Sequence, residues 1–216
     1  MFFVFEKDQL NIDKNKIMEK LRISEDDLDE FNEIYDECLN VARPKFLFEK
    51  KEITCMGDDY VLVEDIPIKS KIAVKNMQNT GYAYPYVVTC GKEIYDYSKS
   101  IDDFFINYWI DAIMEELLYM AMKKMNEAFK EEFSFKKTAS VNPGSTADWN
   151  ISGQRELFSM LKDKIEDTGI TLTDSFLMLP NKSGSGVVYE TKEDYMNCQD
   201  CKREKCPNRK KEFSGK

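Results

Sequence analysis

Histidine is absent from this chain of 216 residues. The absence excludes Ser–His and Cys–His nucleophile pairs and any zinc site that needs an imidazole ligand. Long apolar runs are also missing, since no stretch approaches the roughly 18 residues of a membrane span. The first residues, MFFVFEKDQL, are too few and too soon charged for a signal peptide. We therefore predict no membrane partner. Six cysteines in an untargeted chain then indicate a reducing, cytoplasmic location.

An excess of basic charge is lacking as well. The chain has 31 basic and 40 acidic side chains, and its formal net charge is −9. A nucleic-acid partner is disfavoured, because contact with phosphates needs a basic face. Hydrophobic residues make up 42% and charged residues 33%, as in a globular protein. The length suits one domain with a sizeable core, or two small ones.

Hydrophobic periodicity predicts helices and strands in mixed order. Ser24 is a candidate N-cap for a helix that ends near Pro44. Pro85 indicates that its strand lies at an edge of the sheet or begins at this proline. Because no regular βαβ alternation is seen, we expect an α+β fold with a largely antiparallel sheet. The expected helices cover residues 13–21, 24–43, 70–81, 100–129 and 151–169, and the expected strands 46–55, 58–66, 82–91, 133–141, 171–179 and 187–190.

The longest helical pattern, at 100–129, predicts the central core helix. Its apolar side chains recur at spacings of three and four, which places them on one face. Three cysteines stand singly in apolar patterns, and we expect them to be small buried side chains. The stripe consists of Ile106, Ile110, Ile113, Met114, Leu117, Ala121, Met125 and Ala128, and the single cysteines are Cys38, Cys55 and Cys90.

Two short segments are candidate binding sites. In SVNPGSTADWNISGQ, Pro143 and Gly144 predict a tight turn whose backbone a ligand can approach closely. In LMLPNKSGSGVVYE, the stretch from Lys182 through Ser183, Gly184 and Ser185 to Gly186 predicts a polar loop whose amides and hydroxyls suit phosphate, carboxamide or carboxylate groups. The Gly-x4-Gly-Lys order of a P-loop is absent. A plain strand–helix connection and a plain hairpin loop are the alternatives.

The third candidate is the C-terminal tail, which we separate as residues 194–216 from a domain at 1–193. Cys198, Cys201 and Cys206 have C-x2-C-x4-C spacing, and thiolates bind soft metals. We predict one metal centre there, either an iron–sulfur cluster or zinc. A fourth ligand would come from one of the other cysteines, from a carboxylate such as Asp200, or from a small molecule. A disordered tail with incidental cysteines is the alternative.

Several stretches, in their order along the chain, resemble one known family. They are YPYVVTCGKEIYDY, WIDAIMEELLYMAM, NPGSTADWNISGQRELFSML, LTDSFLMLPNKSGSGVVY and the closing C-x2-C-x4-C-Pro-x-Arg. Together they are similar to the reactivation domain of cobalamin-dependent methionine synthase, in its short stand-alone form from anaerobic bacteria. The resemblance implies a C-shaped α+β fold with a twisted antiparallel sheet.

The resemblance also implies a function. The family docks on the cobalamin of a methyltransferase partner and positions S-adenosylmethionine, so that one-electron reduction of inactive cobalt(II) is trapped by methyl transfer. By this resemblance, Pro143 and Gly144 belong to the turn that holds S-adenosylmethionine, and the segment from Lys182 to Gly186 faces the corrinoid. An iron–sulfur cluster on the tail would offer a route for electrons from a donor protein, whereas zinc would only hold the tail in place.

Three positions depart from the family pattern. The family carries an arginine four residues before the turn glycine, a tyrosine after it and a glutamate on the long helix, where this chain has Ser140, Ser145 and Tyr119. The arginine and the glutamate would pair with the carboxylate and the amine of the ligand. The sequence therefore leaves two hypotheses: an accessory protein for reductive reactivation, or a non-catalytic module that holds a corrinoid protein without S-adenosylmethionine.

Overall fold

The computed structural model describes residues 1–135, 137–206 and 209–214. It has an α+β architecture, as expected, with the sheet strands paired antiparallel throughout. The helices are α1 (Lys14–Leu21), α2 (Leu28–Val41), α3 (Lys71–Met77), α4 (Lys92–Ser100), α5 (Phe104–Phe133) and α6 (Gln154–Met160). The strands are β1 (Phe2–Val4), β2 (Lys45–Phe48), β3 (Lys51–Met56), β4 (Tyr60–Val63), β5 (Ile66–Lys69), β6 (Tyr82–Thr89), β7 (Thr138–Val141), β8 (Thr171–Leu172), β9 (Met178–Leu179) and β10 (Ser183–Glu190).

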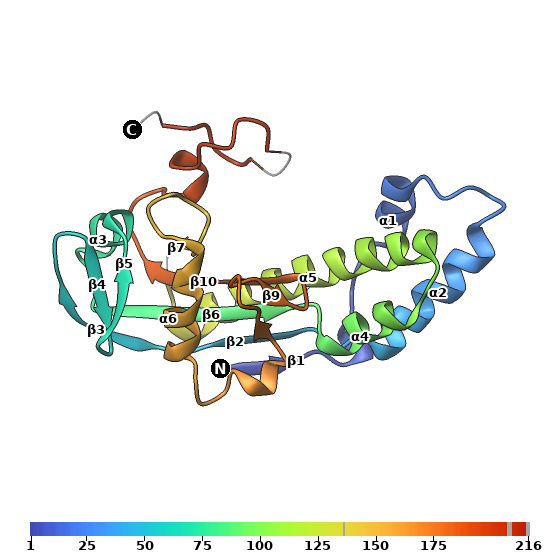
Figure 1. The fold of residues 1–216 in the computed structure, drawn as a ribbon, viewed down its shortest axis with the longest axis horizontal. Coiled ribbons are helices and arrows are strands. Elements are labelled where there is room, and N and C mark those ends of the chain that lie inside the picture. The colour runs from blue at the N-terminus through green and yellow to red at the C-terminus, as the bar shows by residue number, and fades with distance from the viewer. Residues whose placement is uncertain (136, 207–208, 215–216) are drawn as a thin grey trace.

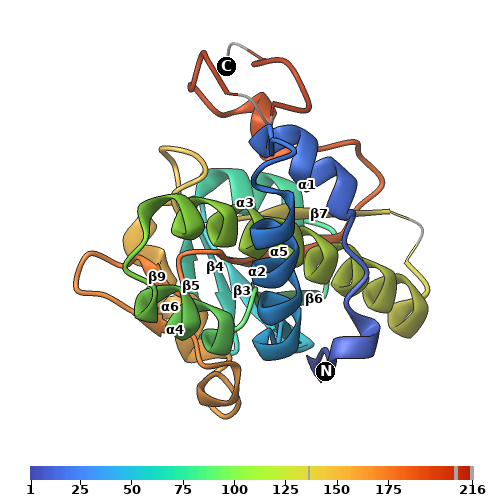
Figure 2. The same ribbon diagram turned by 90° about the vertical axis from the view of Figure 1, so that its right-hand side faces the viewer.

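The molecule is elongated along α5 (Figure 1). Helices α1, α2 and α4 gather at one end of α5, and α3 lies with strands β3 to β5 at the other end. Helix α1 and the C-terminal tail stand on the same side of α5, which gives the molecule its C shape (Figures 1 and 2). No helix in the described part of the chain is long and apolar enough to cross a membrane.

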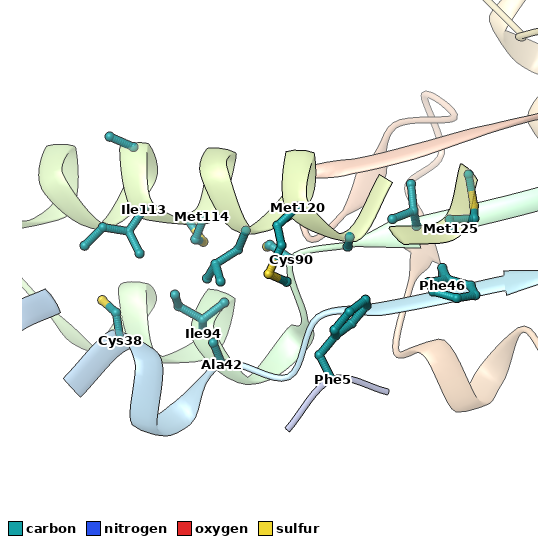
Figure 3. Packing of buried hydrophobic residues seen from close by; sticks show 14 of the residues in the cluster. Phe5, Cys38, Ala42, Phe46, Cys90, Ile94, Ile113, Met114, Met120 and Met125 are labelled. Atoms are coloured by element: carbon teal, nitrogen blue, oxygen red, sulfur yellow. The ribbon is translucent and has the colours of Figure 1, made fainter. Parts of the chain in front are cut away.

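The eight-stranded sheet separates two hydrophobic cores. Alternate residues of β6 face opposite sides, so that Tyr84 and Tyr86 join the core under α5 while Val87 joins the core under α3 and α6. Burial on both faces explains why β6 reads as a nearly continuous apolar run. Figure 3 shows the core under α5, where side chains from α2, α4, α5 and β2 meet.

Helix α5 confirms the predicted core helix. The Asp103 side chain caps its first turn by accepting hydrogen bonds from the amides of Phe105 and Ile106 at 2.8 and 3.0 Å. Most of the predicted stripe is buried, and Ile106 and Ala128 pack at its margins. Cys38 and Cys90 are buried as expected (Figure 3). The prediction was wrong for Cys55, which is exposed on β3.

The predicted position of Pro85 was also wrong, because β6 is central and has neighbours on both sides. Pro85 faces Val187 of β10 on one side, and its carbonyl accepts from the amide of Glu49 at 3.2 Å on the other. Glu49 lies in the gap between β2 and β3. A proline is tolerated here because its missing N–H falls opposite this break in the neighbouring strands.

Other boundaries differ from the sequence expectations. Helix α2 begins at Leu28, and Ser24 instead accepts from the amide of Asp27 at 3.3 Å in the preceding turn. Only Gln154–Met160 of the helix expected at 151–169 is α-helical. A short 3-10 helix follows at Glu166–Thr168, and it ends at Gly169, which has the left-handed conformation. The strand expected at 171–179 is a small hairpin of β8 and β9, because the chain reverses through Phe176 at φ 64°.

Candidate functional site

The segment from Lys182 to Gly186 is not a loop, so that prediction was wrong. From Ser183 onward it forms β10, paired residue by residue with β6. The hydroxyl of Ser183 donates to Thr89 Oγ1 at 2.9 Å, and the hydroxyl of Ser185 donates to Gln154 Oε1, also at 2.9 Å. Ser185 is buried at 7% exposure. Internal hydrogen bonds therefore use these hydroxyls, and only Lys182, Ser183 and Gly184 remain partly exposed.

Gly186 is a packing requirement of this strand. A Cβ at this position would lie 2.1 Å from Asn142 Nδ2 and 2.9 Å from both Tyr86 Cε1 and the carbonyl oxygen of Val141. Glycine inside a strand often marks such a close approach of another group. Gly186 is thus small because neighbouring chain segments fill the space on this side of β10.

Asn142 is the centre of a hydrogen-bond network next to β10. Its Nδ2 atom donates to the Tyr86 hydroxyl at 2.9 Å and to the carbonyl of Ser185 at 2.6 Å. Its Oδ1 atom accepts from Ser140 Oγ at 3.2 Å and from Asn197 Nδ2 at 2.6 Å. Burial raises the pKa of Tyr86, while the hydrogen bonds from Asn142 and Ser140 oppose that rise. One side chain thus joins the ligand turn, the sheet and the tail.

The predicted turn at Pro143 and Gly144 is present. Gly144 has φ 78°, and its amide donates to the carbonyl of Trp149 at 2.8 Å. An added Cβ would lie 2.8 Å from Ile151 Cδ1. A left-handed glycine is therefore required here both by the backbone and by the space available. The amide of Ser145 donates to the carbonyl of Asn142 at 3.1 Å and closes the turn.

Both amides of the turn, those of Gly144 and Ser145, already donate to carbonyls of this chain. Ser140, which stands where the family has arginine, lies on β7 opposite Val188 and is engaged by Asn142. Tyr119, which stands where the family has glutamate, donates to Glu115 Oε1 on its own helix at 3.0 Å. Neither side chain carries a charge that could pair with a carboxylate or an amine.

Lys182 links the start of β10 to α5. Its Nζ atom lies 2.8 Å from Asp111 Oδ2, and the pair is partly exposed. Tyr108 is one turn earlier on α5 and Phe104 another turn earlier, so both fall on the face of Asp111. Phe104 is 80% exposed and Tyr108 54% exposed. Large exposed aromatic side chains beside a salt bridge are typical of an interaction surface.

We expect Ser185→Ala to lower the free energy of unfolding by about 1 to 2 kcal/mol, because Gln154 Oε1 loses its donor in a buried position. Ser159→Ala, at an exposed position of α6, is the matched control and should change stability little. Denaturant titration measures both. An unchanged stability combined with weaker partner binding would show that the Ser185 hydroxyl serves the partner and not the fold.

The tail is organised by Arg209. Its guanidinium donates to the carbonyls of Cys198, Cys201 and Lys211 at 2.9, 3.1 and 3.3 Å, and to that of Arg203 at 2.5 Å. Backbone hydrogen bonds from Lys210 lower the pKa of Cys198, and the nearby cationic side chains add to the effect. The tail is tied to the site through Asn197, the residue directly before Cys198.

The tail cysteines are free thiols of intermediate exposure. Within the described residues, neither they nor any other three histidine, cysteine, aspartate or glutamate side chains are grouped closely enough to hold a metal ion. The arrangement described here therefore does not fit a resident metal, and the predicted centre requires that the tail rearrange around it.

Sequence reasoning missed the most connected residues of the site. Asn142 carried a weak signal, since asparagine directly before Pro-Gly is typical of a turn. The roles of Tyr86 and Asn197 carried no local signal, because they depend on pairing across 56 and 55 residues of chain. Arg209 is adjacent to the cysteine motif but was not assigned a structural role.

Comparisons with known proteins identify the family and the fold of this chain. A family described as "Vitamin B12 dependent methionine synthase, activation domain" matches residues 65–212, which is more than half of the chain. No curated protein matches. Among solved structures, the chain is similar to one titled "Crystal Structure of the MetH Reactivation Domain bound to AdoHcy", with 12% identity, a TM-score of 0.58, and coverage of 90% of this chain and 79% of the other. That likeness shows a shared fold. The family match shows that the chain belongs to the activation domains of vitamin B12-dependent methionine synthase.

Proposed function

We propose that this protein assists the reductive reactivation of a cobalamin-dependent methyltransferase of the methionine synthase type. The family match carries the proposal, and the shared fold with a reactivation domain supports it. The cobalamin belongs to the partner, where it supplies the cobalt that is reduced and methylated. In this proposal the chain works as a docking and positioning component, in a reducing cytosol, with electrons supplied from a separate donor protein or through the tail.

The role of this chain's own residues follows from the site. Asn142 fixes the Pro143–Gly144 turn against β10. We propose that S-adenosylmethionine binds at this turn through neutral hydrogen bonds. Lys182 and the exposed face of α5 that carries Phe104 and Tyr108 then meet the corrinoid module of the partner.

A second function is favoured by one observation. Ser140 and Tyr119 replace the charged residues of the family pattern, and both are engaged in hydrogen bonds inside the chain. A module that holds the corrinoid protein without S-adenosylmethionine would need no charges there. Calorimetry separates the two functions: one-to-one binding of S-adenosylmethionine that Gly144→Val abolishes supports the activator, and no heat at millimolar ligand supports the holding module.

We also propose that Cys198, Cys201 and Cys206 bind one metal centre after the tail closes around it. Support comes from the cysteine spacing and from the lowered pKa of Cys198, because thiolates are the metal ligands. The expected result is one zinc ion or one iron–sulfur cluster per chain in protein prepared without oxygen. Elemental analysis and the absorption spectrum distinguish the two centres.

Two variants control this measurement. Cys201→Ser should release the metal and leave the core folded, since the tail contributes little buried apolar area. Cys55→Ser, at an exposed cysteine on β3, should keep the metal. Metal that persists at full stoichiometry in the triple Cys→Ser variant would refute the assignment.

A further inference from the structure

A second pocket lies at the far end of β10 from Lys182. Its volume is about 710 Å³, within the range of small-molecule sites. It is bounded by the last turn of α3, the start of β6, the end of α5 and the segment that follows β10. The lining includes Lys75, Asn76, Tyr82, Phe133, Glu190 and Lys192. None of these residues belongs to the turn at Pro143 and Gly144, so the pocket is distinct from the proposed S-adenosylmethionine site.

Aromatic rings form one wall of this pocket. The ring centroid of Tyr84 lies 4.6 Å from that of Phe133 and 5.3 Å from that of Phe135. The rings of Phe133 and Phe135 stack with an interplanar angle of 22°. Tyr82 is 46% exposed at the pocket, with Lys50 Nζ 3.8 Å from its ring centroid. Partly exposed rings of this kind offer a flat apolar surface to a planar ligand.

Charges of both signs surround the same space. Lys50, Lys75 and Lys192 are cationic, and Glu190 and Glu193 are anionic. Across the described residues, none of the five takes part in a salt bridge, although other lysines and glutamates of the chain do. A ligand with a single charge would be repelled either by the lysines or by the glutamates. A ligand with one positive and one negative group could pair with both sets.

We propose that this pocket binds a small aromatic zwitterion, which is a planar ring system that bears both an ammonium and a carboxylate group. The ring lies against Tyr82, Phe133 and Phe135. The carboxylate meets Lys75 on α3, and the ammonium meets Glu193 on the facing segment. This site goes beyond the proposed function, because it needs neither the corrinoid partner nor the Pro143–Gly144 turn.

The test uses four probes that share one ring and differ in charge: L-tryptophan, tryptamine, indole-3-propionate and indole. Calorimetry on the full chain measures each. L-Tryptophan is expected to bind at least about tenfold more tightly than each of the others, since each analogue leaves at least one charged group of the pocket unpaired. Equal binding of indole and L-tryptophan, or no binding of L-tryptophan at millimolar concentration, would overturn the proposal.

Two variants locate the binding. Lys75→Gln and Glu193→Gln should each weaken the binding of L-tryptophan by about fivefold, which is the upper range for the loss of one partly exposed charge pair. Lys71→Gln, on the first turn of the same helix and outside the pocket lining, is the matched control and should leave binding unchanged. If Lys71→Gln weakened binding as much as Lys75→Gln, the effect would come from general charge and the proposed site would be wrong. Because the assay contains no corrinoid protein, its outcome is independent of the reactivation proposal.

Discussion

Gly186→Ala is expected to lower the free energy of unfolding by about 3 kcal/mol. The new methyl group would lie 2.1 Å from Asn142 Nδ2 and 2.9 Å from the Val141 carbonyl, so both the side chain and the neighbouring strand would have to move. Overpacking of this kind costs about 1 to 3 kcal/mol. A displaced Asn142 amide would also lose its hydrogen bond to the buried Tyr86 hydroxyl, at a cost of about 1 kcal/mol.

Gly184→Ala is the matched control, two residues earlier on the same strand. Its Cβ would approach only Val88 Cγ1, at 3.3 Å, and that side chain can adjust. We expect a change of less than about 1 kcal/mol. Urea titration of both variants measures the difference. Equal stabilities would contradict the view that the glycine at 186 is required by the Asn142 network.

Replacing Phe104 and Tyr108 together with serine is expected to weaken binding to the corrinoid protein by at least about thirtyfold. Truncation of one aromatic anchor in an interface costs about 2 kcal/mol, which corresponds to that factor. Both side chains are more than half exposed, so stability should change little. Binding is measured with the partner in its cobalt(II) state, and unfolding is measured in parallel.

Conservative changes at the same positions provide the control. Phe104→Leu with Tyr108→Phe keeps the apolar surface and should retain most of the affinity. If the serine variant bound the partner as tightly as the unaltered protein, the exposed face at the start of α5 would not be the docking surface. If both double variants lost binding equally, a specific aromatic contact would matter more than apolar area.

Hydrophobic periodicity predicted the elements whose apolar residues are also the residues buried in the fold. Helix α5 was clear from its stripe because one face is buried along the helix, first against α1, α2 and α4 and then against the sheet. Pro143–Gly144 was clear because the turn requires these residue types locally. The second half of β10 was expected as a strand, but its first half was missed because Ser183 to Gly186 have small and polar side chains. Their extended conformation comes from pairing with residues of β6 that lie 94 to 100 positions earlier in the chain.

Contacts between residues that are distant in the sequence also limited the prediction of the site. The turn glycine could be named from sequence, but the contact between Asn142 and Asn197 depends on where β10 carries the tail after the sheet. The hydroxyls of Ser183 and Ser185 had the chemistry of a binding loop, and tertiary packing directs them to Thr89 and Gln154 instead. Residue type indicated the chemistry available, whereas only the fold decided which groups remained for a ligand.

The central claim is that this chain supports reductive reactivation of a corrinoid methyltransferase. The most direct measurement mixes the protein with its methyltransferase partner in the cobalt(II) state, adds S-adenosylmethionine and a reductant, and follows the corrinoid absorption spectrum. The account predicts conversion to methyl-cobalt that requires this protein and that falls when Phe104 and Tyr108 are replaced with serine. A spectrum that stays that of cobalt(II), or that converts equally well without this protein, would contradict the account.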